Sequence, residues 1–352
     1  MVALYITSTE ATGKTALCAG IGRKLLDQGV KVGFLMPVQL PETNNHDGYE
    51  DVAFIKETLA LTESSEQLCP IRLPQAELWR SLTTDIADFT QKLKQGYRKI
   101  SRDKDVVVME GLGSLGVDKI STLACYTIAE TLEAKVVILL RYSSTLDISK
   151  VVQIADKLGQ SLLGVVINFV PESKIETVRL ELAALFNEAG IKVLGILPEI
   201  RSLLGISVGE LVKVLDGETL NPPESIDDIV ENVMVGAMSL DSGINYFNVK
   251  ENKAVVVRGD RADMQLAALE TSVKCLILTN NIKPLPPVIS QAQDKHIPIV
   301  VVKQDTSAAI SCIEDILTKA NFQSPRKLEA LSSVLDCYFD FKSLYSGLGL
   351  KA

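Results

Sequence analysis

The stretch "STEATGKT", Ser8–Thr15, decides the fold because it joins a strand-like run to a helix-like run. The residues before it, "MVALYIT", are mostly apolar and include the β-branched Val2, Ile6 and Thr7. After it, Leu17, Ile21 and Leu25 recur at four-residue steps, which is typical of one helix face, and Gly29 is placed to end that helix. The pattern predicts a strand, a tight loop and a helix in immediate succession.

The loop itself ends in the residues of a phosphate-binding loop. Gly13 lets the backbone approach a phosphate, Lys14 can reach the terminal phosphates of a nucleotide, and the Thr15 hydroxyl can ligate Mg²⁺. A helix beginning directly behind the loop favours an anion there. Full spacing would place a glycine at position 8, where the chain has Ser8, so we expect a slightly different loop path. An ordinary strand–turn–helix corner is the alternative.

Continuous apolar runs alternate with helix-like segments through the first two-thirds of the chain. Such runs are typical of strands buried on both faces of a parallel sheet. The fold class expected is therefore α/β, with a parallel sheet covered by helices and right-handed crossovers. The expected strands are residues 2–7, 31–35, 105–110, 135–140, 163–168 and 193–197.

A second, smaller α/β domain follows a polar segment, "DGETLNPPESIDD", which is rich in glycine, proline and acids. Beyond it come "MVGAMS", "KAVVVR", "CLILT" and "IPIVVVK", again separated by helix-like segments. We therefore expect a nucleotide-binding domain at residues 1–216, an α/β domain at 227–323 and a helical tail at 324–352.

Composition excludes several classes of partner. The 352 residues carry a formal net charge of -8, with 36 basic and 44 acidic residues, which argues against duplex DNA and anionic membranes. The six cysteines form no Cys-x-x-Cys pair and are expected to be buried and reduced. No signal peptide is visible and no apolar run approaches the ~20 residues of a membrane span. The protein is expected to be soluble and cytoplasmic.

Glu110 is a candidate metal ligand at a strand end. It closes the run "VVVME", and Gly111 and Gly113 follow it. In open α/β sheets, ligands bind beyond the carboxyl ends of the strands, and a carboxylate there can hold Mg²⁺ directly or through water. The alternative is a solvated strand end.

Two further polar residues have both a structural and a functional interpretation. Asp51 precedes the apolar helix face of Val52, Ile55 and Leu59, so it either caps that helix or supplies a second carboxylate to Mg²⁺. Asn168 ends "GVVIN" and either forms a turn or pairs with the edge of a purine base.

In the second domain, two strand-end corners are candidates. Asp260 and Asp263 predict a helix cap resembling a capping box, and the alternative is an anionic effector or oligomer contact at Arg261. Asp305 and Thr306 form a similar corner after "IPIVVVK".

Taken together, these motifs resemble a known family. "STEATGKT", "VVVMEGLG" and "GVVINFVP" resemble the dethiobiotin-synthetase-like branch of P-loop proteins. "VGAMSLDSGINYF", "RGDRADMQLAALETSVKCLILT" and "IPIVVVKQDTSAAI" resemble the DRTGG domain. In this order the two resemble the N-terminal regulatory region of long bacterial phosphotransacetylases, over nearly the whole chain.

The resemblance implies a role for each candidate residue. ATP and Mg²⁺ are the implied ligands, and Lys14 is the implied catalytic cation. Gly13, Lys14 and Thr15 would cradle the ATP phosphates, Thr9 and Glu10 would line the loop mouth, Asn168 would face the base, and Thr15, Asp51 and Glu110 would serve Mg²⁺.

Three departures limit what the resemblance implies. The chain ends at Ala352, shortly after the second domain, so phosphotransacetylase activity is not expected. Met36 stands where dethiobiotin synthetases carry a lysine, which puts that synthesis in doubt. At 260–263 the second domain keeps only Asp-Arg of its name motif, so its ligand stays open.

Three functions compete at this point. The first is a regulatory module that binds Mg-ATP in its first domain, with the second domain as a surface for a partner or a second copy. The second is an ATP-dependent ligase of the dethiobiotin or cobyrinate a,c-diamide synthase type, which would transfer the γ-phosphate to a substrate. The third is a scaffold whose loop is a relic.

Overall fold

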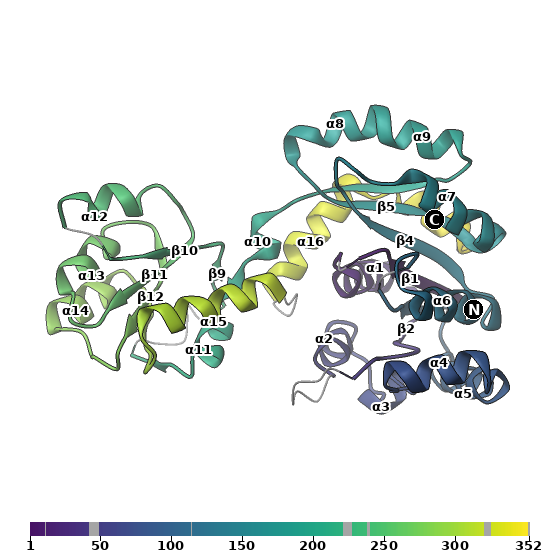
Figure 1. Cartoon of the computed structure of the whole chain (residues 1–352), viewed down its shortest axis with the longest axis horizontal. Coiled ribbons are helices and arrows are strands. Elements are labelled where there is room, and N and C mark those ends of the chain that lie inside the picture. The colour runs from purple at the N-terminus through teal and green to yellow at the C-terminus, as the bar shows by residue number, and fades with distance from the viewer. Residues whose placement is uncertain are drawn as a thin grey trace. The chain divides into compact units, whose positions relative to one another are not determined.

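The computed structural model describes residues 1–10, 12–41, 49–113, 115–220, 227–237, 240–319 and 325–350. Contacts between α-carbons divide the chain into two compact units (Figure 1). The first comprises Met1–Glu199 and Leu331–Ala352, and the second comprises Ile200–Ala330. The C-terminal residues therefore belong to the same unit as the N-terminal loop.

The first unit contains a parallel sheet of six strands within the described residues. Their order across the sheet is β2-β3-β1-β4-β5-β6, and every pairing is parallel. The expected parallel sheet is confirmed. The strands are β1 Val2–Ser8, β2 Val32–Leu35, β3 Val106–Glu110, β4 Lys135–Arg141, β5 Leu162–Val170 and β6 Val193–Pro198.

The strand order places a topological switch at β1. The chain first builds one side of the sheet with β2 and β3, and then builds the other side with β4, β5 and β6. Ligands of open α/β sheets bind where the strand order reverses, beyond the carboxyl ends of the strands. That position is the loop after Ser8.

Helices connect these strands. Leu17, Ile21 and Leu25 of α1 are buried as expected, and Gly29 takes a left-handed φ of 80° just beyond the helix end. The helices are α1 Lys14–Asp27, α2 Glu50–Thr58, α3 Ser65–Leu68, α4 Gln75–Thr83, α5 Ile86–Ile100, α6 Lys119–Thr131, α7 Ile148–Leu158, α8 Ile175–Thr177 and α9 Ala183–Glu188.

The first unit is completed by residues from the end of the chain, in α16 (Pro325–Tyr338) and α17 (Phe341–Gly347). A side chain at Gly20 of α1 would collide with the chain end, because an added Cβ would lie 2.5 Å from Leu335 Cδ1. At the edge strand β6, Phe339 forms an isolated antiparallel bridge with Gly195. These contacts cover α1 and part of the β6 edge.

The second unit contains a five-stranded sheet in the described residues. Its order is β10-β11-β12-β13-β8, with β8 antiparallel and the others parallel. The strands are β8 Glu218–Thr219, β10 Asn232–Val235, β11 Lys253–Arg258, β12 Val273–Thr279 and β13 Ile299–Val301, and a separate pair is formed by β7 Ile206–Ser207 and β9 Ile229–Val230.

Alternate residues of this sheet face two different cores. Val255, Leu276 and Ile299 pack with α12, α13 and α14 on one face, whereas Val256 and Ile277 pack with α11 and α15 on the other. Figure 1 shows these helices on opposite sides of the strands. The helices are α10 Arg201–Leu204, α11 Val208–Val214, α12 Leu240–Phe247, α13 Ala262–Leu269, α14 Pro286–Asp294 and α15 Thr306–Lys319.

Among the helices that the structure describes, none is both long and apolar enough to cross a membrane. Of the six cysteines, Cys312 is half-buried and Cys337 is exposed, and the other four are buried. The cysteines were expected to be buried and reduced, and all six are free thiols.

Candidate functional site

The phosphate-loop residues lie at the end of β1, at the switch point of the sheet. Gly13 has φ 84° and ψ 38°, a left-handed conformation that glycine adopts at no steric cost, and α1 begins at the next residue. The Lys14 Nζ donates a hydrogen bond to Ser8 Oγ at 3.1 Å, and Ser8 Oγ donates to the Glu10 carbonyl oxygen at 2.5 Å. The serine that replaces the leading glycine therefore holds the lysine.

Glu110 lies directly beside the loop. It pairs in register with Ile6 across β1 and β3, and its carboxylate Oε1 accepts a hydrogen bond from Thr15 Oγ1 at 2.8 Å. The residue is 6% exposed, and Oε2 has no hydrogen-bond partner among the described residues. The expected proximity of Thr15 and Glu110 is therefore present in the structure.

The pKa of Glu110 is raised to about 7, mainly by burial and also by the negative charge of Asp51. The Lys14 ammonium and the hydrogen bond from Thr15 act in the opposite direction. A carboxylate that is buried, incompletely bonded and close to a second carboxylate is a favourable place for a cation.

Asp51 does not cap its helix, so the capping interpretation was wrong. Tyr49 occupies the N-cap position of α2, and Asp51 is the second residue of the helix, in its first turn. Asp51 is half-buried and its charge acts on both Glu110 and the Cys18 thiol, which places it in the same region of the molecule. The residues before it, 42–48, lie outside the described residues.

Mg²⁺ fits the donors present. The orphaned Oε2 of Glu110 is a buried oxygen available to a cation, and the Thr15 hydroxyl lies 2.8 Å from the other oxygen of the same group. In the described part of the chain, no group of three or more His, Cys, Asp or Glu residues forms a metal cage. Mg²⁺ in nucleotide sites takes only one or two carboxylates and completes its shell with phosphates and water.

The glycines after β3 leave room at Lys14. A Cβ on Gly113 would lie 3.3 Å from Lys14 Nζ, and a Cβ on Gly111 would lie 2.6 Å from the Tyr5 hydroxyl. Leu115 N–H donates to the Ser8 carbonyl oxygen at 2.9 Å, which fixes this loop against the end of β1. The buried tyrosine leaves no room for a Cβ at Gly111, whereas a Cβ at Gly113 would require only a small shift of the lysine end.

Asn168 connects β5 to the phosphate loop. Its Nδ2 donates to the Thr12 carbonyl oxygen at 2.9 Å, and its Oδ1 accepts from Phe169 N–H at 2.9 Å. Phe169 has a φ of 59°, and Arg141 lies over its ring at 4.3 Å. A contact of Asn168 with a base stays a prediction.

The remaining loop residues differ in exposure. Thr9 is half-buried and Glu10 is exposed, whereas Ala11 lies outside the described residues. Thr12 is 1% exposed, and its hydroxyl has no partner among the residues described.

The first corner of the second unit is built from ion pairs, so the capping-box interpretation was wrong. Asp260 accepts two hydrogen bonds from Arg258, and Asp263 accepts two from Arg261. Arg261 itself occupies the N-cap position of α13, without a side-chain cap.

The second corner behaves as an ordinary helix start. Asp305 accepts a hydrogen bond from Ala308 N–H at 2.8 Å, which confirms capping there. The Thr306 hydroxyl lies 3.0 Å from that of Thr279.

Sequence reasoning missed two features of this site. The loop pattern marks Ser8 only as a departure, although its hydroxyl is the acceptor for Lys14. The stacking of Arg141 on Phe169, and the left-handed backbone at Phe169, have no signal in the sequence. The first could have been found from the ability of a serine at the strand end to accept a hydrogen bond.

Two known family models match this chain, and each covers most of one unit. Residues 2–207 match the family model described as an AAA domain, and residues 210–316 match the DRTGG domain. The expected combination of a dethiobiotin-synthetase-like P-loop domain and a DRTGG domain is confirmed.

Individual relatives are distant. Over 370 residues the chain is 24% identical to a phosphate acetyltransferase of Nitratidesulfovibrio vulgaris, covering 98% of this chain and 51% of that enzyme. It is 24% identical over 200 residues to an ATP-dependent dethiobiotin synthetase of Methanococcus vannielii, covering 55% of this chain and 92% of that protein. The solved structure of the MinD cell division protein of Aquifex aeolicus aligns with a TM-score of 0.37 at 17% identity, over 58% of this chain and 84% of that one. The chain spans about half the length of the phosphate acetyltransferase it matches.

Proposed function

The chain belongs to the family of AAA domains matched by residues 2–207, and on this premise we propose that it is a regulatory module that binds Mg-ATP. The nucleotide site is the loop Gly13–Thr15 with Glu110 beside it. The second unit, which carries the DRTGG domain, is the part through which the bound state is passed to a partner or to a second copy.

One observation carries the proposal. The Lys14 ammonium, the Thr15 hydroxyl and a buried carboxylate with one unpartnered oxygen converge at the switch point of a parallel sheet. A cation and an anion together satisfy this arrangement better than either alone, because Lys14 needs a negative partner and Glu110 Oε2 needs a positive one.

In the proposed complex, the loop residues bind the phosphates, and Thr15 and Glu110 bind the metal ion. The backbone N–H groups around Gly13 and the first turn of α1 face the phosphates, and Lys14 exchanges the Ser8 hydroxyl for a phosphate oxygen. Thr15 and Glu110 hold Mg²⁺, with Asp51 adding negative charge. The metal neutralises phosphate charge when bound.

An ATP-dependent ligase is the second candidate, and the match to a dethiobiotin synthetase favours it because 92% of that protein is covered. Against it, Met36 is 7% exposed and cannot donate to a phosphate or steady a carbamate, in the place where the family resemblance puts a lysine. Release of inorganic phosphate that depends on an added carboxylic acid would support the ligase over the regulatory module.

A thermal-shift screen of Mg²⁺ with ATP, GTP and ADP tests the proposal. Ligand binding to the folded state raises stability by RT ln(1 + [L]/Kd), about 2.7 kcal/mol at a hundredfold excess over Kd. We expect Mg-ATP to raise the melting temperature of the wild type and of Lys31→Ala, an exposed lysine outside the loop, but not of Lys14→Ala.

Two outcomes would contradict the proposal. One is a wild type whose melting temperature does not respond to any nucleotide. The other is an equal response in Lys14→Ala and in the wild type, which would leave the phosphate loop without a role.

A further inference from the structure

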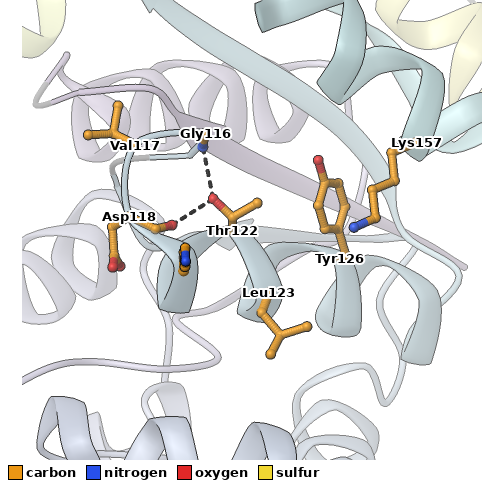
Figure 2. A pocket seen from close by; sticks show the side chains of 8 residues that line it. Gly116, Val117, Asp118, Thr122, Leu123, Tyr126 and Lys157 are labelled. Atoms are coloured by element: carbon orange, nitrogen blue, oxygen red, sulfur yellow. Dashed lines mark hydrogen bonds between the residues drawn. The ribbon is translucent and has the colours of Figure 1, made fainter.

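We propose that a cavity between α6, α7 and the loop before α6 binds a small organic carboxylate. The cavity lies within the first unit and has a volume of about 260 Å³. Its wall includes Lys119 of α6. Thr122 and Tyr126 of α6 and Lys157 of α7 also line it, as Figure 2 shows. This site goes beyond the nucleotide function, since none of the residues assigned to the nucleotide lines it.

Two ammonium groups give the cavity its charge. Lys119 and Lys157 are both exposed, and in the described part of the chain neither forms an ion pair with a carboxylate. Lys157 Nζ lies over the ring of Tyr126 at 4.2 Å, as Figure 2 shows from the side. A cation held over an aromatic face remains able to pair with an anion in the cavity.

The single carboxylate in the wall is already engaged. Asp118 is the N-cap of α6 and accepts from Ile120 N–H at 3.3 Å and from Ser121 N–H at 2.8 Å. The Ser121 hydroxyl donates to it at 2.7 Å, and these bonds lower the pKa of Asp118. The negative charge of Asp118 is stabilised by the donors at the start of α6. The net charge of the residues that line the cavity is therefore positive, because of the two lysines.

The shape of the cavity is set before any ligand arrives. Gly116 has a φ of 79°, and a Cβ there would lie 2.9 Å from Ile154 Cδ1 of α7. Gly116 N–H donates to Thr122 Oγ1 at 2.9 Å, and Thr122 Oγ1 donates to the Asp118 carbonyl oxygen at 2.6 Å, as the dashed lines of Figure 2 mark. The loop, α6 and α7 are therefore fitted to one another.

The same contacts select the class of ligand. A phosphate would be bound by the free N–H groups at the start of α6, but Asp118 already accepts from two of them. Two lysine point charges beside apolar Leu123 and the 73% exposed Val117 suit a carboxylate with an apolar body. The volume is at the small end for ligand sites, which restricts the body to about one ring or a short chain.

Benzoate is a probe of this class, and benzamide is its neutral counterpart of the same shape. In ¹⁵N-TROSY titrations of the full chain, we expect saturable benzoate shifts with a millimolar Kd at amides near Gly116 and Tyr126. Lys157→Met or Lys119→Met should weaken binding about tenfold, the loss of one charge-assisted hydrogen bond. Lys150→Met, on the same helix but outside the cavity, should bind benzoate as the wild type does.

The proposal is overturned if benzoate does not bind saturably, or if benzamide binds equally well. It is also overturned if both lysine variants keep the affinity of the wild type. Displacement of benzoate by inorganic phosphate at equal concentration would likewise overturn it. Lys14→Ala separates this site from the nucleotide site. We expect it to keep benzoate binding, and we expect Lys157→Met to keep the melting-temperature rise with Mg-ATP.

Discussion

At the scale of single residues, Ser8 determines how Lys14 is held beside the loop. The hydroxyl accepts from the ammonium and donates to the Glu10 carbonyl, so it bridges the two ends of the loop. A glycine, which the loop pattern has at this position, offers no such acceptor. The lysine is therefore held by the protein itself, and under the proposed function a phosphate replaces the serine hydroxyl as its partner.

The substitution Ser8→Ala tests this exchange. Loss of the bridging hydroxyl should lower the free energy of unfolding without nucleotide by about 1–3 kcal/mol, since its hydrogen bonds to Lys14 and to the Glu10 carbonyl are both lost. Saturating Mg-ATP should then stabilise Ser8→Ala more than the wild type, because Lys14 no longer leaves a partner. Chemical denaturation with and without Mg-ATP measures both effects, and a smaller nucleotide effect in Ser8→Ala would contradict the exchange.

Glu110 makes stability depend on pH. Its pKa is raised from 4.5 to about 7, so between these values the folded chain holds more protons on this group than the unfolded chain. Stability without Mg²⁺ should therefore be highest below the lower value, fall as pH rises toward 7, and level off above it.

The variant Glu110→Gln isolates this contribution. It should be more stable than the wild type at pH 8, by on the order of a few kcal/mol, and the difference should shrink toward pH 5. It should also lose most of the stabilisation that Mg²⁺ adds to ATP. Melting curves across this pH range provide the measurement, and a pH-independent difference would show that the pKa of Glu110 is not raised.

At the scale of elements, the end of β5 holds the phosphate loop through Asn168. Both atoms of its side-chain amide bond to backbone groups, one in the loop and one in its own strand. Asn168 therefore fixes the conformation of the loop, whether or not it also contacts the base of a nucleotide.

The substitution Asn168→Ala follows from this role. Without the bond to the Thr12 carbonyl the loop is less well formed, so affinity should fall by a similar factor for ATP and GTP, about fivefold to tenfold. Calorimetric titration with both nucleotides provides the comparison. A selective loss of ATP affinity would instead indicate that Asn168 reads the base.

The sheet of the first unit was predictable because its strands are continuous apolar runs. Each of the six expected runs became a strand, since only burial on both faces suits such sequences. Helix starts were less predictable. Asp51 and Asp260 both precede apolar helix faces, but a cap depends on turn geometry, and Asp260 pairs with Arg258 instead. Thr15 and Glu110 are far apart in the chain, and the strand edge predicted that both lie at the same site, but not the hydrogen bond between them.

At the scale of the whole molecule, the chain crosses into its second unit and returns to its first. Leu331 and Leu335 of α16 lie against Gly20 of α1, and Asp340 N–H donates to the Leu194 carbonyl oxygen at 2.7 Å. The polar pattern of the last residues had suggested a separate tail at 324–352. A single sequence shows that a helix is amphipathic, but it does not show which surface the apolar face will cover.

Truncation after Ala330 tests this arrangement. The first unit should lose stability, and Mg-ATP should stabilise it less, because α1 begins at the phosphate loop and packs against the removed residues. Thermal unfolding should show the transition of the second unit little changed. An unaltered nucleotide response in the truncated chain would contradict the expectation.

A matched pair of point variants avoids the change in length. Leu335 is 1% exposed, so Leu335→Ala should lower the free energy of unfolding of the first unit by about 2–4 kcal/mol. Cys337 is exposed on the same helix, and Cys337→Ala should change it by less than about 0.5 kcal/mol. Denaturant titrations compare the two.

The return of residues 331–352 to the first unit also has a consequence for biosynthesis. A ribosome delivers residues at about 5–20 per second, N-terminal ones first, so α1 emerges well before the helix that covers it. Until translation has passed residue 335, the hydrophobic surface around Gly20 remains exposed, and chaperones or neighbouring nascent chains can bind it. The first unit is therefore completed only after the whole second unit has been synthesised.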